Sequence, residues 1–195
     1  EHWEGREVFI HLGAVKSAAH FWLNGVWLGY NQDGKTPVEF DITPYLREGG
    51  NVLAVEVYRW SDGSYLECQD YWRLSGIHRD VFLWSTPKVH VQDFFVKGGL
   101  NEACTQGELS IVAKIENYAH IQPKGYQLAY ELLDAEGIRV FEATQDLGES
   151  LSQQIELNWE TQLDNVHHWT AETPYLYQSI FYLKNETGEV VEVVG

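Results

Sequence analysis

Methionine is absent from the 195-residue chain, and cysteine occurs only at Cys68 and Cys104. Two thiols cannot build the disulfide framework of a small secreted domain, so both are interpreted as free and the redox compartment stays open. The sequence has no CxxC, no HExxH and no histidine–cysteine cluster, and so contains no motif for a zinc site. Because an initiator methionine is also absent, the chain is expected to be cut from a longer one.

Basic residues are scarce. Lys and Arg number 13 against 29 Asp and Glu, which gives a net charge of −16. A chain of this charge repels nucleic acid and anionic membranes, so neither is expected as a partner. Residues 1–90 carry 8 basic and 12 acidic groups (8 − 12 = −4), whereas residues 91–195 carry 5 and 17 (5 − 17 = −12). The acidic second half fits a solvated exterior.

Long apolar runs are missing as well. No stretch approaches the roughly 18 uninterrupted apolar residues of a membrane span. Residues 1–6 contain no basic region followed by an apolar one, so no signal peptide is expected and the cytoplasm is favoured over the periplasm. The sequence also shows no long amphipathic helix, no solenoid repeat and no low-complexity tract. What remains is a globular protein built from short elements.

Short segments rich in Val, Ile, Phe, Tyr and Trp, each closed by a turn signal, predict strands through the first half of the chain. Residues 20–30 predict a hairpin, because Asn24-Gly25 at its centre accepts the positive φ angles of a type I′ turn. A single helical turn is predicted with Thr43 as its N-cap and Pro44 at its first position. Further strands are expected at 7–12, 38–42, 51–60 and 77–84.

The sixteen residues 61–76 show no clear period, and a loop of that length inside a compact β domain is usually functional. The sequence texture changes near Pro87, which predicts two domains, 1–88 and 89–195. About seven short segments in the second domain, separated by turn signals, fit an immunoglobulin-like or fibronectin III-like β-sandwich. They are 89–96, 108–116, 126–133, 138–142, 152–159, 176–183 and 189–194. The predicted fold class is therefore all-β.

Aromatic residues are abundant, with 8 Trp and 11 Tyr, and six of the Trp precede residue 90. Trp is a large core residue, and its ring face also packs against the C–H faces of sugar rings. We assign most of these Trp to the core or to sheet faces, namely Trp22, Trp27, Trp60 and Trp84. One or two near the carboxylates of the 61–76 loop remain candidates for a sugar platform.

Four segments carry longer and more specific patterns. They read FWLNGVWLGY (21–30), PVEFDITPYL (37–46), RWSDGSYLECQDYWRLSGIHRDV (59–81) and WTAETPYLY (169–177). In this order they resemble segments of glycoside hydrolase family 2. The third is a nearly gapless match to a run in the large bacterial β-galactosidases of that family. The resemblance covers nearly the whole chain, and its Trp-Ser-Asp-Gly-Ser-Tyr-Leu-Glu run favours galactosidases over the β-glucuronidases and β-mannosidases of the same family.

In that family a sugar-binding jelly roll is followed by an immunoglobulin-like domain, a catalytic TIM barrel and further β domains. The resemblance implies that residues 1–88 are the C-terminal part of the jelly roll and 89–195 the immunoglobulin-like domain. The first jelly-roll strands and the barrel are expected to lie outside this chain. A retaining glycosidase needs two carboxylates, and the resemblance places both on the barrel. No catalytic residue is expected here, and the chain alone is expected to be inactive.

The resemblance singles out Asp70, which matches a family aspartate that contacts galactosyl hydroxyls and a sodium ion at the mouth of the barrel. A carboxylate only accepts hydrogen bonds, which suits a pair of sugar hydroxyls as well as a hard cation. Local sequence alone favours a loop-stabilising role for Asp70, and the long match reverses that preference. Trp72 is a weaker sugar-contact candidate, since a Trp there is more often a packing residue. Relatives often carry an acid at the position of Cys68, so this departure bears on the charge beside Asp70 and leaves the implied role of Asp70 unchanged.

The remaining sodium ligands and a magnesium site are implied to lie on the barrel, so this segment alone is expected to bind no cofactor. The first hypothesis is a non-catalytic part of an oligomeric β-galactosidase for terminal, lactose-type β-D-galactosides. Its partners are the galactoside and the other domains of the enzyme, above all the barrel. The alternatives are a stand-alone carbohydrate-binding module and a purely structural β-sandwich scaffold.

Overall fold

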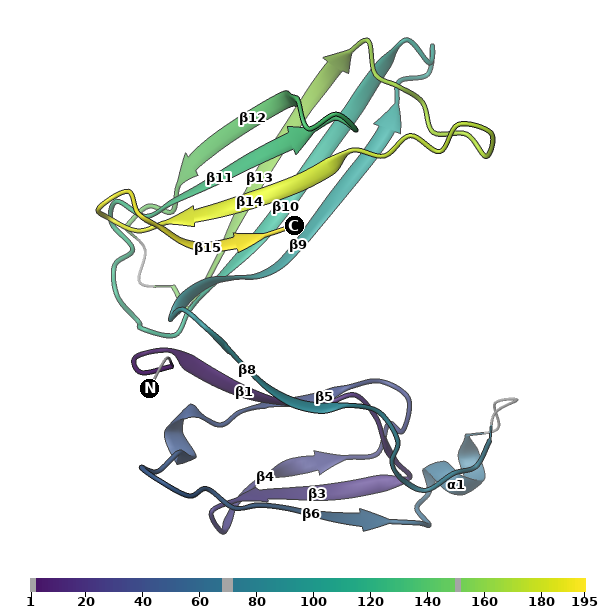
Figure 1. The fold of residues 1–195 in the computed structure, drawn as a ribbon, viewed down its shortest axis with the longest axis vertical. Coiled ribbons are helices and arrows are strands. Elements are labelled where there is room, and N and C mark those ends of the chain that lie inside the picture. The colour runs from purple at the N-terminus through teal and green to yellow at the C-terminus, as the bar shows by residue number, and fades with distance from the viewer. Residues whose placement is uncertain (1–2, 68–71, 150–151) are drawn as a thin grey trace. The chain divides into compact units, whose positions relative to one another are not determined.

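The computed structural model describes residues 3–67, 72–149 and 152–195. The chain divides into two compact units, residues 1–86 and 87–195, and the elements of both are labelled in Figure 1. Strands dominate both units, which confirms the all-β prediction. No helix in the described ranges is long and apolar enough to cross a membrane.

The first unit contains two three-stranded antiparallel sheets that lie across a shared core (Figure 1). One sheet has the order β5–β1–β8, formed by Val38–Asp41, Glu7–Leu12 and Val81–Thr86. The other has the order β4–β3–β6, formed by Val26–Asn31, Ala18–Leu23 and Leu53–Tyr58. A short pair, β2 (Val15–Lys16) with β7 (Gly76–Ile77), completes the unit among the described residues.

The core of this unit follows from the two-residue alternation of its strands. In β1, Val8, Ile10 and Leu12 face inward and expose 4% or less of their area. They meet Phe21 and Leu23 of β3, which are exposed by 0% and 4%. Each such side chain stabilises the fold by about 1.5–3 kcal/mol. The aliphatic residues of both sheets therefore point toward one another.

A close approach between the two sheets occurs at Gly29 of β4. The ring of Phe40, which belongs to β5, lies so near that a Cβ at Gly29 would fall 2.6 Å from its Cε1 atom. Phe40 also packs on Phe21, with their ring centroids 5.0 Å apart. The φ angle of Gly29 is not positive, so the backbone conformation does not demand glycine here. Glycine is required because the Phe40 ring leaves no room for a Cβ atom.

The predicted hairpin is confirmed. Asn24 and Gly25 connect β3 to β4 with φ angles of 53° and 85°, as a type I′ turn demands. The pairing shifts register between Phe21 and Trp22, so β4 carries one extra residue at that point. The bulge keeps Trp22 and Trp27 opposite each other on the same face.

The predicted N-cap at Thr43 is wrong. The turn is a 3₁₀ helix, η1 (Thr43–Tyr45), with Thr43 inside it and Ile42 at the N-cap. The Asp41 carboxylate accepts a hydrogen bond from the Thr43 N–H, while the Thr43 hydroxyl accepts one from the Val8 N–H at 2.8 Å. Tertiary contact with β1 therefore takes the hydroxyl that local sequence assigned to capping.

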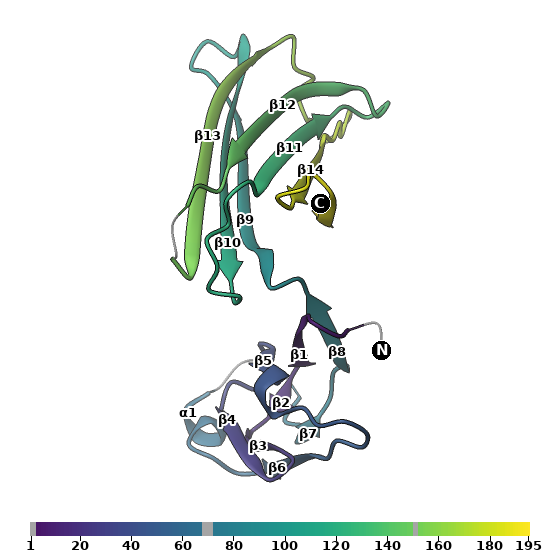
Figure 2. The same ribbon diagram turned by 90° about the vertical axis from the view of Figure 1, so that its left-hand side faces the viewer.

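In its described residues the second unit is a sandwich of seven strands, the number expected for an immunoglobulin-like fold (Figure 2). One sheet has the order β13–β10–β9, formed by Gln154–Asp164, Gln106–Asn117 and Val89–Leu100. The other has the order β12–β11–β14–β15, formed by Arg139–Asp146, Gln127–Leu133, Gln178–Lys184 and Val190–Val194. Two turns of this unit end at Gly137 and Gly188, which have φ angles of 79° and 80°.

Tyr130 and Phe181 occupy the centre of the second core, and neither exposes any area. Their ring centroids are 4.9 Å apart. The Tyr130 hydroxyl shares a 2.9 Å hydrogen bond with the Ser179 hydroxyl, so the buried polar atom has a partner. Burial raises the pKa of Tyr130, which keeps the phenol neutral.

His90 is the unusual buried group of this unit. It exposes 4% of its area and stacks on Tyr118, with their ring centroids 5.6 Å apart. Its Nε2 atom has no hydrogen-bond partner among the described residues. Burial lowers the pKa of His90 to about 4, because a charged imidazole would lose its hydration there. The neutral ring is therefore the form that the fold accommodates.

This depressed pKa predicts acid sensitivity of the second unit. Unfolded His titrates near 6.5, so the unfolded state takes up a proton first as the pH falls. The contribution of His90 to stability is complete above pH 6.5 and is lost as the pH falls toward about 4. We expect the Tm, followed by calorimetry, to fall more steeply over this window in the wild type than in His90→Gln. Identical slopes for the two proteins would contradict the prediction.

Candidate functional site

The segment after β6 is built around one turn of α-helix, α1 (Gly63–Leu66). The Asp62 carbonyl accepts 3.0 Å hydrogen bonds from the N–H groups of Tyr65 and Leu66. Ser61 tethers the segment to the sheet, since its hydroxyl accepts a 2.7 Å hydrogen bond from Ser17. The sequence showed no helical period here because a helix of four residues is too short to display one.

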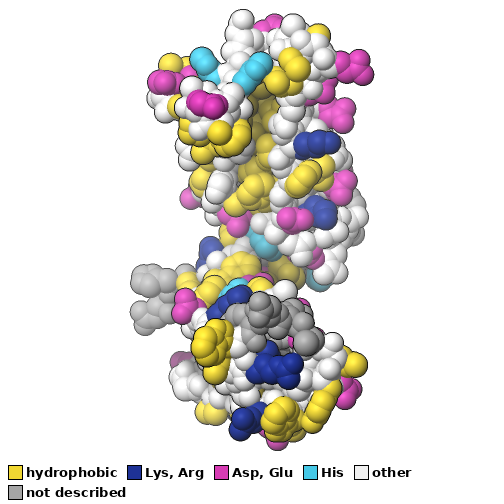
Figure 3. Space-filling view, turned by 90° about the vertical axis from the view of Figure 1, so that its right-hand side faces the viewer, with side chains coloured by type: hydrophobic (Ala, Val, Ile, Leu, Met, Phe, Trp, Pro, Cys, Tyr) yellow, Lys and Arg dark blue, Asp and Glu magenta, His cyan; other side chains and the backbone are white. Residues whose placement is uncertain are grey.

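A depression of about 160 Å³ lies beside α1. Its charged lining residues are Lys16, Arg59, Arg73 and Glu67, three cations against one carboxylate in a chain of net charge −16. Figure 3 shows Lys and Arg side chains (dark blue) among hydrophobic ones (yellow) on this face of the first unit. Lys and Arg donate hydrogen bonds, and Glu accepts them. A hydroxyl group of a ligand, which can both donate and accept, therefore has a partner for either bond in this depression.

Large apolar side chains surround the depression. Trp60 and Tyr65 stack with their ring centroids 6.2 Å apart, and the Arg59 guanidinium lies 5.4 Å from the Trp60 ring. Trp60 exposes 62% of its area and Tyr65 78%. Exposed apolar groups gathered in this way mark surfaces that contact a ligand or another domain.

The structure describes only some of the predicted site residues. Asp70 and Cys68 lie outside the described residues, so the role assigned to Asp70 stays a prediction. Trp72 is described and exposes 78% of its area. Glu67 and Arg73, which come before and after the segment 68–71, both line the depression. The described residues on the two sides of this segment therefore lie at one depression.

The described side chains do not by themselves fit a metal ion. In residues 3–67, 72–149 and 152–195, no group of three or more His, Cys, Asp or Glu is close enough to hold one. Sodium and magnesium prefer several oxygen ligands arranged around the ion.

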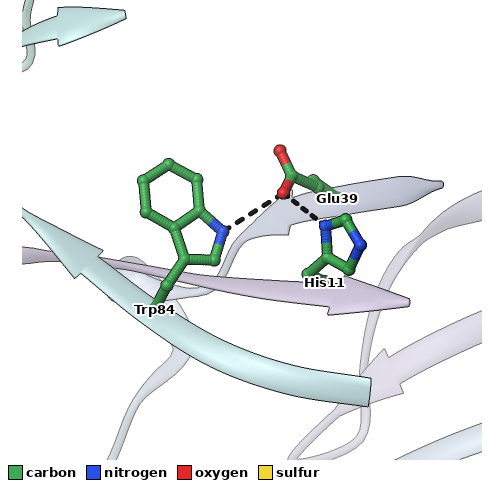
Figure 4. Close-up of polar contacts among 3 residues, drawn as sticks. All are labelled: His11, Glu39 and Trp84. Atoms are coloured by element: carbon green, nitrogen blue, oxygen red, sulfur yellow. Dashed lines mark hydrogen bonds and ion pairs between the residues drawn. The ribbon is translucent and has the colours of Figure 1, made fainter. Parts of the chain in front are cut away.

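A polar cluster that the sequence reasoning missed lies on the outer face of the β5–β1–β8 sheet (Figure 4). One oxygen of Glu39 is 2.7 Å from Nδ1 of His11 and accepts a 3.2 Å hydrogen bond from the Trp84 indole. His11 stacks on Phe82 at 4.3 Å, and Trp84 stacks on Phe9 at 4.6 Å. The strand alternation was the available signal, because these residues fall between the inward-facing ones. The contacts indicate a structural cluster that orders the sheet face.

Glu39 is the centre of this cluster, so its replacement tests the structural assignment. We expect Glu39→Ala to lower the free energy of unfolding by about 1 kcal/mol, since two partly solvated hydrogen bonds are lost. Urea unfolding measures the change. The control is Glu48→Ala, an exposed acid of the same unit, and equal stability of the two variants would refute the assignment.

Comparison with known proteins relates this geometry to a family. Residues 1–87 match the model described as the sugar binding domain of glycosyl hydrolases family 2, and residues 89–195 match a second model of that family. The chain belongs to glycoside hydrolase family 2. The family resemblance carried by the four sequence segments is thereby confirmed.

Curated relatives of this family 2 chain include a β-galactosidase of Priestia megaterium, 44% identical over 97% of the chain. A β-galactosidase of Halalkalibacterium halodurans is 42% identical over 96% of it. The chain spans 18% of the length of each relative. It therefore corresponds to a minor part of those enzymes.

Solved structures share the fold of this family 2 chain. The crystal structure of a Bacteroides uniformis β-glucuronidase has a TM-score of 0.87 and 24% identity, covering 100% of this chain and 24% of that one. A Bifidobacterium dentium β-glucuronidase has a TM-score of 0.77 and 19% identity, covering 99% of this chain and 36% of its own. Identities this low support the fold and nothing finer.

Proposed function

We propose that this segment is a non-catalytic part of a β-galactosidase that hydrolyses terminal, lactose-type β-D-galactosides. In that enzyme it helps to form the galactose subsite through Asp70 and positions the TIM barrel. The observation that carries the proposal is the 44% and 42% identity to two β-galactosidases over nearly the whole chain. Solved β-glucuronidases share the fold at 24% identity or less, so the substrate assignment rests on the β-galactosidase relatives alone.

The surroundings of the segment 68–71 support a sugar contact. Glu67 and Arg73 line one depression, and Trp72 follows with an exposed ring. A carboxylate accepts hydrogen bonds from two neighbouring hydroxyls, and an indole face packs on the C–H face of a pyranose. Asp70 supplies the first kind of contact and Trp72 the second, while Asp70 also contributes one oxygen to a sodium ion held mainly by other domains.

Exposed apolar residues on the same loop support the positioning role. Leu66 exposes 82% of its area and Leu74 61%, in addition to Trp60, Tyr65 and Trp72. A side chain of this size gains about 1.5–3 kcal/mol when fully buried. The proposal assigns this surface to contact with the barrel.

Asp70 is the residue whose replacement tests the galactose subsite. We expect Asp70→Ala in the full-length enzyme to lower kcat/KM for a chromogenic galactoside by about 10- to 100-fold, because a charge-assisted contact is worth about 1.5–3 kcal/mol. Asp70→Asn should lose less, since the amide keeps one acceptor oxygen. Asp62→Asn is the matched control, because the Asp62 side chain makes no capping hydrogen bond to α1. Unchanged KM and kcat in Asp70→Ala would overturn the subsite.

The proposal assigns no catalytic carboxylate to this segment. The purified 195-residue chain is therefore expected to hydrolyse no chromogenic galactoside, whereas the full-length enzyme does so under the same conditions. The measurement is the rate of product release against protein concentration. A rate that rises in proportion to the purified chain would show that the chemistry resides here.

A further inference from the structure

The outer face of the β4–β3–β6 sheet, on the side away from the core, carries five aromatic rings. Phe21 and Leu23 of β3 point into the core, so their neighbours point outward. We call this outward group the aromatic platform; it consists of His20, Trp22, Trp27, Tyr30 and Tyr58. In Figure 1 the sheet that carries it lies across the core from β5–β1–β8, so the platform faces away from that sheet.

The rings of the platform form one continuous patch around His20. The His20 ring centroid is 4.8 Å from that of Tyr30, 5.7 Å from Trp22, 6.0 Å from Tyr58 and 6.3 Å from Trp27. Trp27, Tyr30 and Tyr58 expose 56%, 45% and 42% of their areas. Rings from β4 and β6, the two strands that flank β3, are therefore open to a ligand at the same time.

Hydrogen bonds fix the edges of these rings and leave their faces open. The Trp27 indole N–H donates to Nδ1 of His20 at 3.3 Å, and the Tyr30 hydroxyl donates to Gln32 at 2.8 Å. A hydrogen bond with Glu56 raises the pKa of Tyr58, so its hydroxyl stays protonated beside the carboxylate. Rings held in this way lose little freedom on binding, which favours affinity.

The chemistry of the platform indicates a neutral, hydroxyl-rich ligand. Its apolar surface consists of ring faces, whereas the aliphatic residues of the same sheet, Leu23, Val55 and Val57, pack toward the core. None of the five platform residues is Lys or Arg, and Glu56, which lies opposite His20 in the strand register, is hydrogen-bonded to Tyr58. Flat aromatic faces with hydrogen-bonding edges match pyranose rings, which have an apolar C–H face and polar margins.

We propose that the aromatic platform binds consecutive pyranose rings of an oligo- or polysaccharide, and that this binding does not require Asp70. The description of the matching family model, a sugar binding domain, agrees with a sugar as the occupant. Another protein domain is the competing occupant. Protein interfaces are also enriched in Trp and Tyr, so the measurements below are chosen to distinguish a protein domain from a saccharide.

The test is affinity electrophoresis of the full-length enzyme in native gels with and without soluble β-1,4-galactan; the choice of galactan rests on the proposed function. We expect galactan to retard the wild type. Trp27→Ala should weaken apparent binding about 5- to 10-fold, because one stacking ring is lost, and Trp27→Phe should retain most of it. The matched control is Trp169→Ala, which removes a similarly exposed indole from the second unit and should leave the retardation unchanged.

Two further measurements separate the platform from the Asp70 subsite. Excess free galactose should leave the retardation intact, and Trp27→Ala should keep the wild-type kcat/KM on a small chromogenic galactoside. A Tyr58→Leu variant checks the platform at a second position, and thermal unfolding confirms that each variant is folded. Absence of retardation in the wild type, or equal retardation of wild type, Trp27→Ala and Tyr58→Leu, would overturn the proposal. In that event, lower thermal stability of Trp27→Ala in the full-length enzyme would identify the platform as a contact between domains.

Discussion

The two-residue alternation of side chains along each strand governs both the core and the exposed surface of the first unit. In β1, Val8 and Ile10 turn toward the facing sheet, and this forces Phe9 and His11 to the opposite side. By the same alternation, β3 directs Phe21 and Leu23 into the core and directs His20 and Trp22 to the outer face. Because the core face must be apolar, the register is fixed, and the outer aromatic groups are fixed with it.

Much of this architecture is readable from local sequence. Asn24-Gly25 predicted the first hairpin because only a few residue pairs tolerate its φ angles, and those angles are present. The seven strands of the second unit were predicted from short segments separated by turn signals, although β10 and β13 extend beyond the segments that marked them. Backbone pairing continues into residues that carry no hydrophobic signal, so strand ends are set by the partner strand.

The features that sequence reasoning missed depend on contacts between distant segments. Thr43 was assigned to an N-cap by local preference, but its hydroxyl bonds to Val8, 35 positions earlier. The cluster around Glu39 joins three strands, and no single segment contains its pattern. Asp70 was predicted from a long resemblance instead, and the structure adds that Glu67 and Arg73, on the two sides of the segment 68–71, line one depression.

The contact between Gly29 and Phe40 has a consequence for how this fold tolerates sequence change. Phe40 belongs to one sheet, and its ring occupies the space above Gly29 of the other sheet. Sliding one sheet past the other would drive that ring into the neighbouring side chains of β4. Residue 29 therefore admits hydrogen alone as a side chain. The absence of a Cβ atom at Gly29 thus fixes how the two sheets of the first unit are aligned.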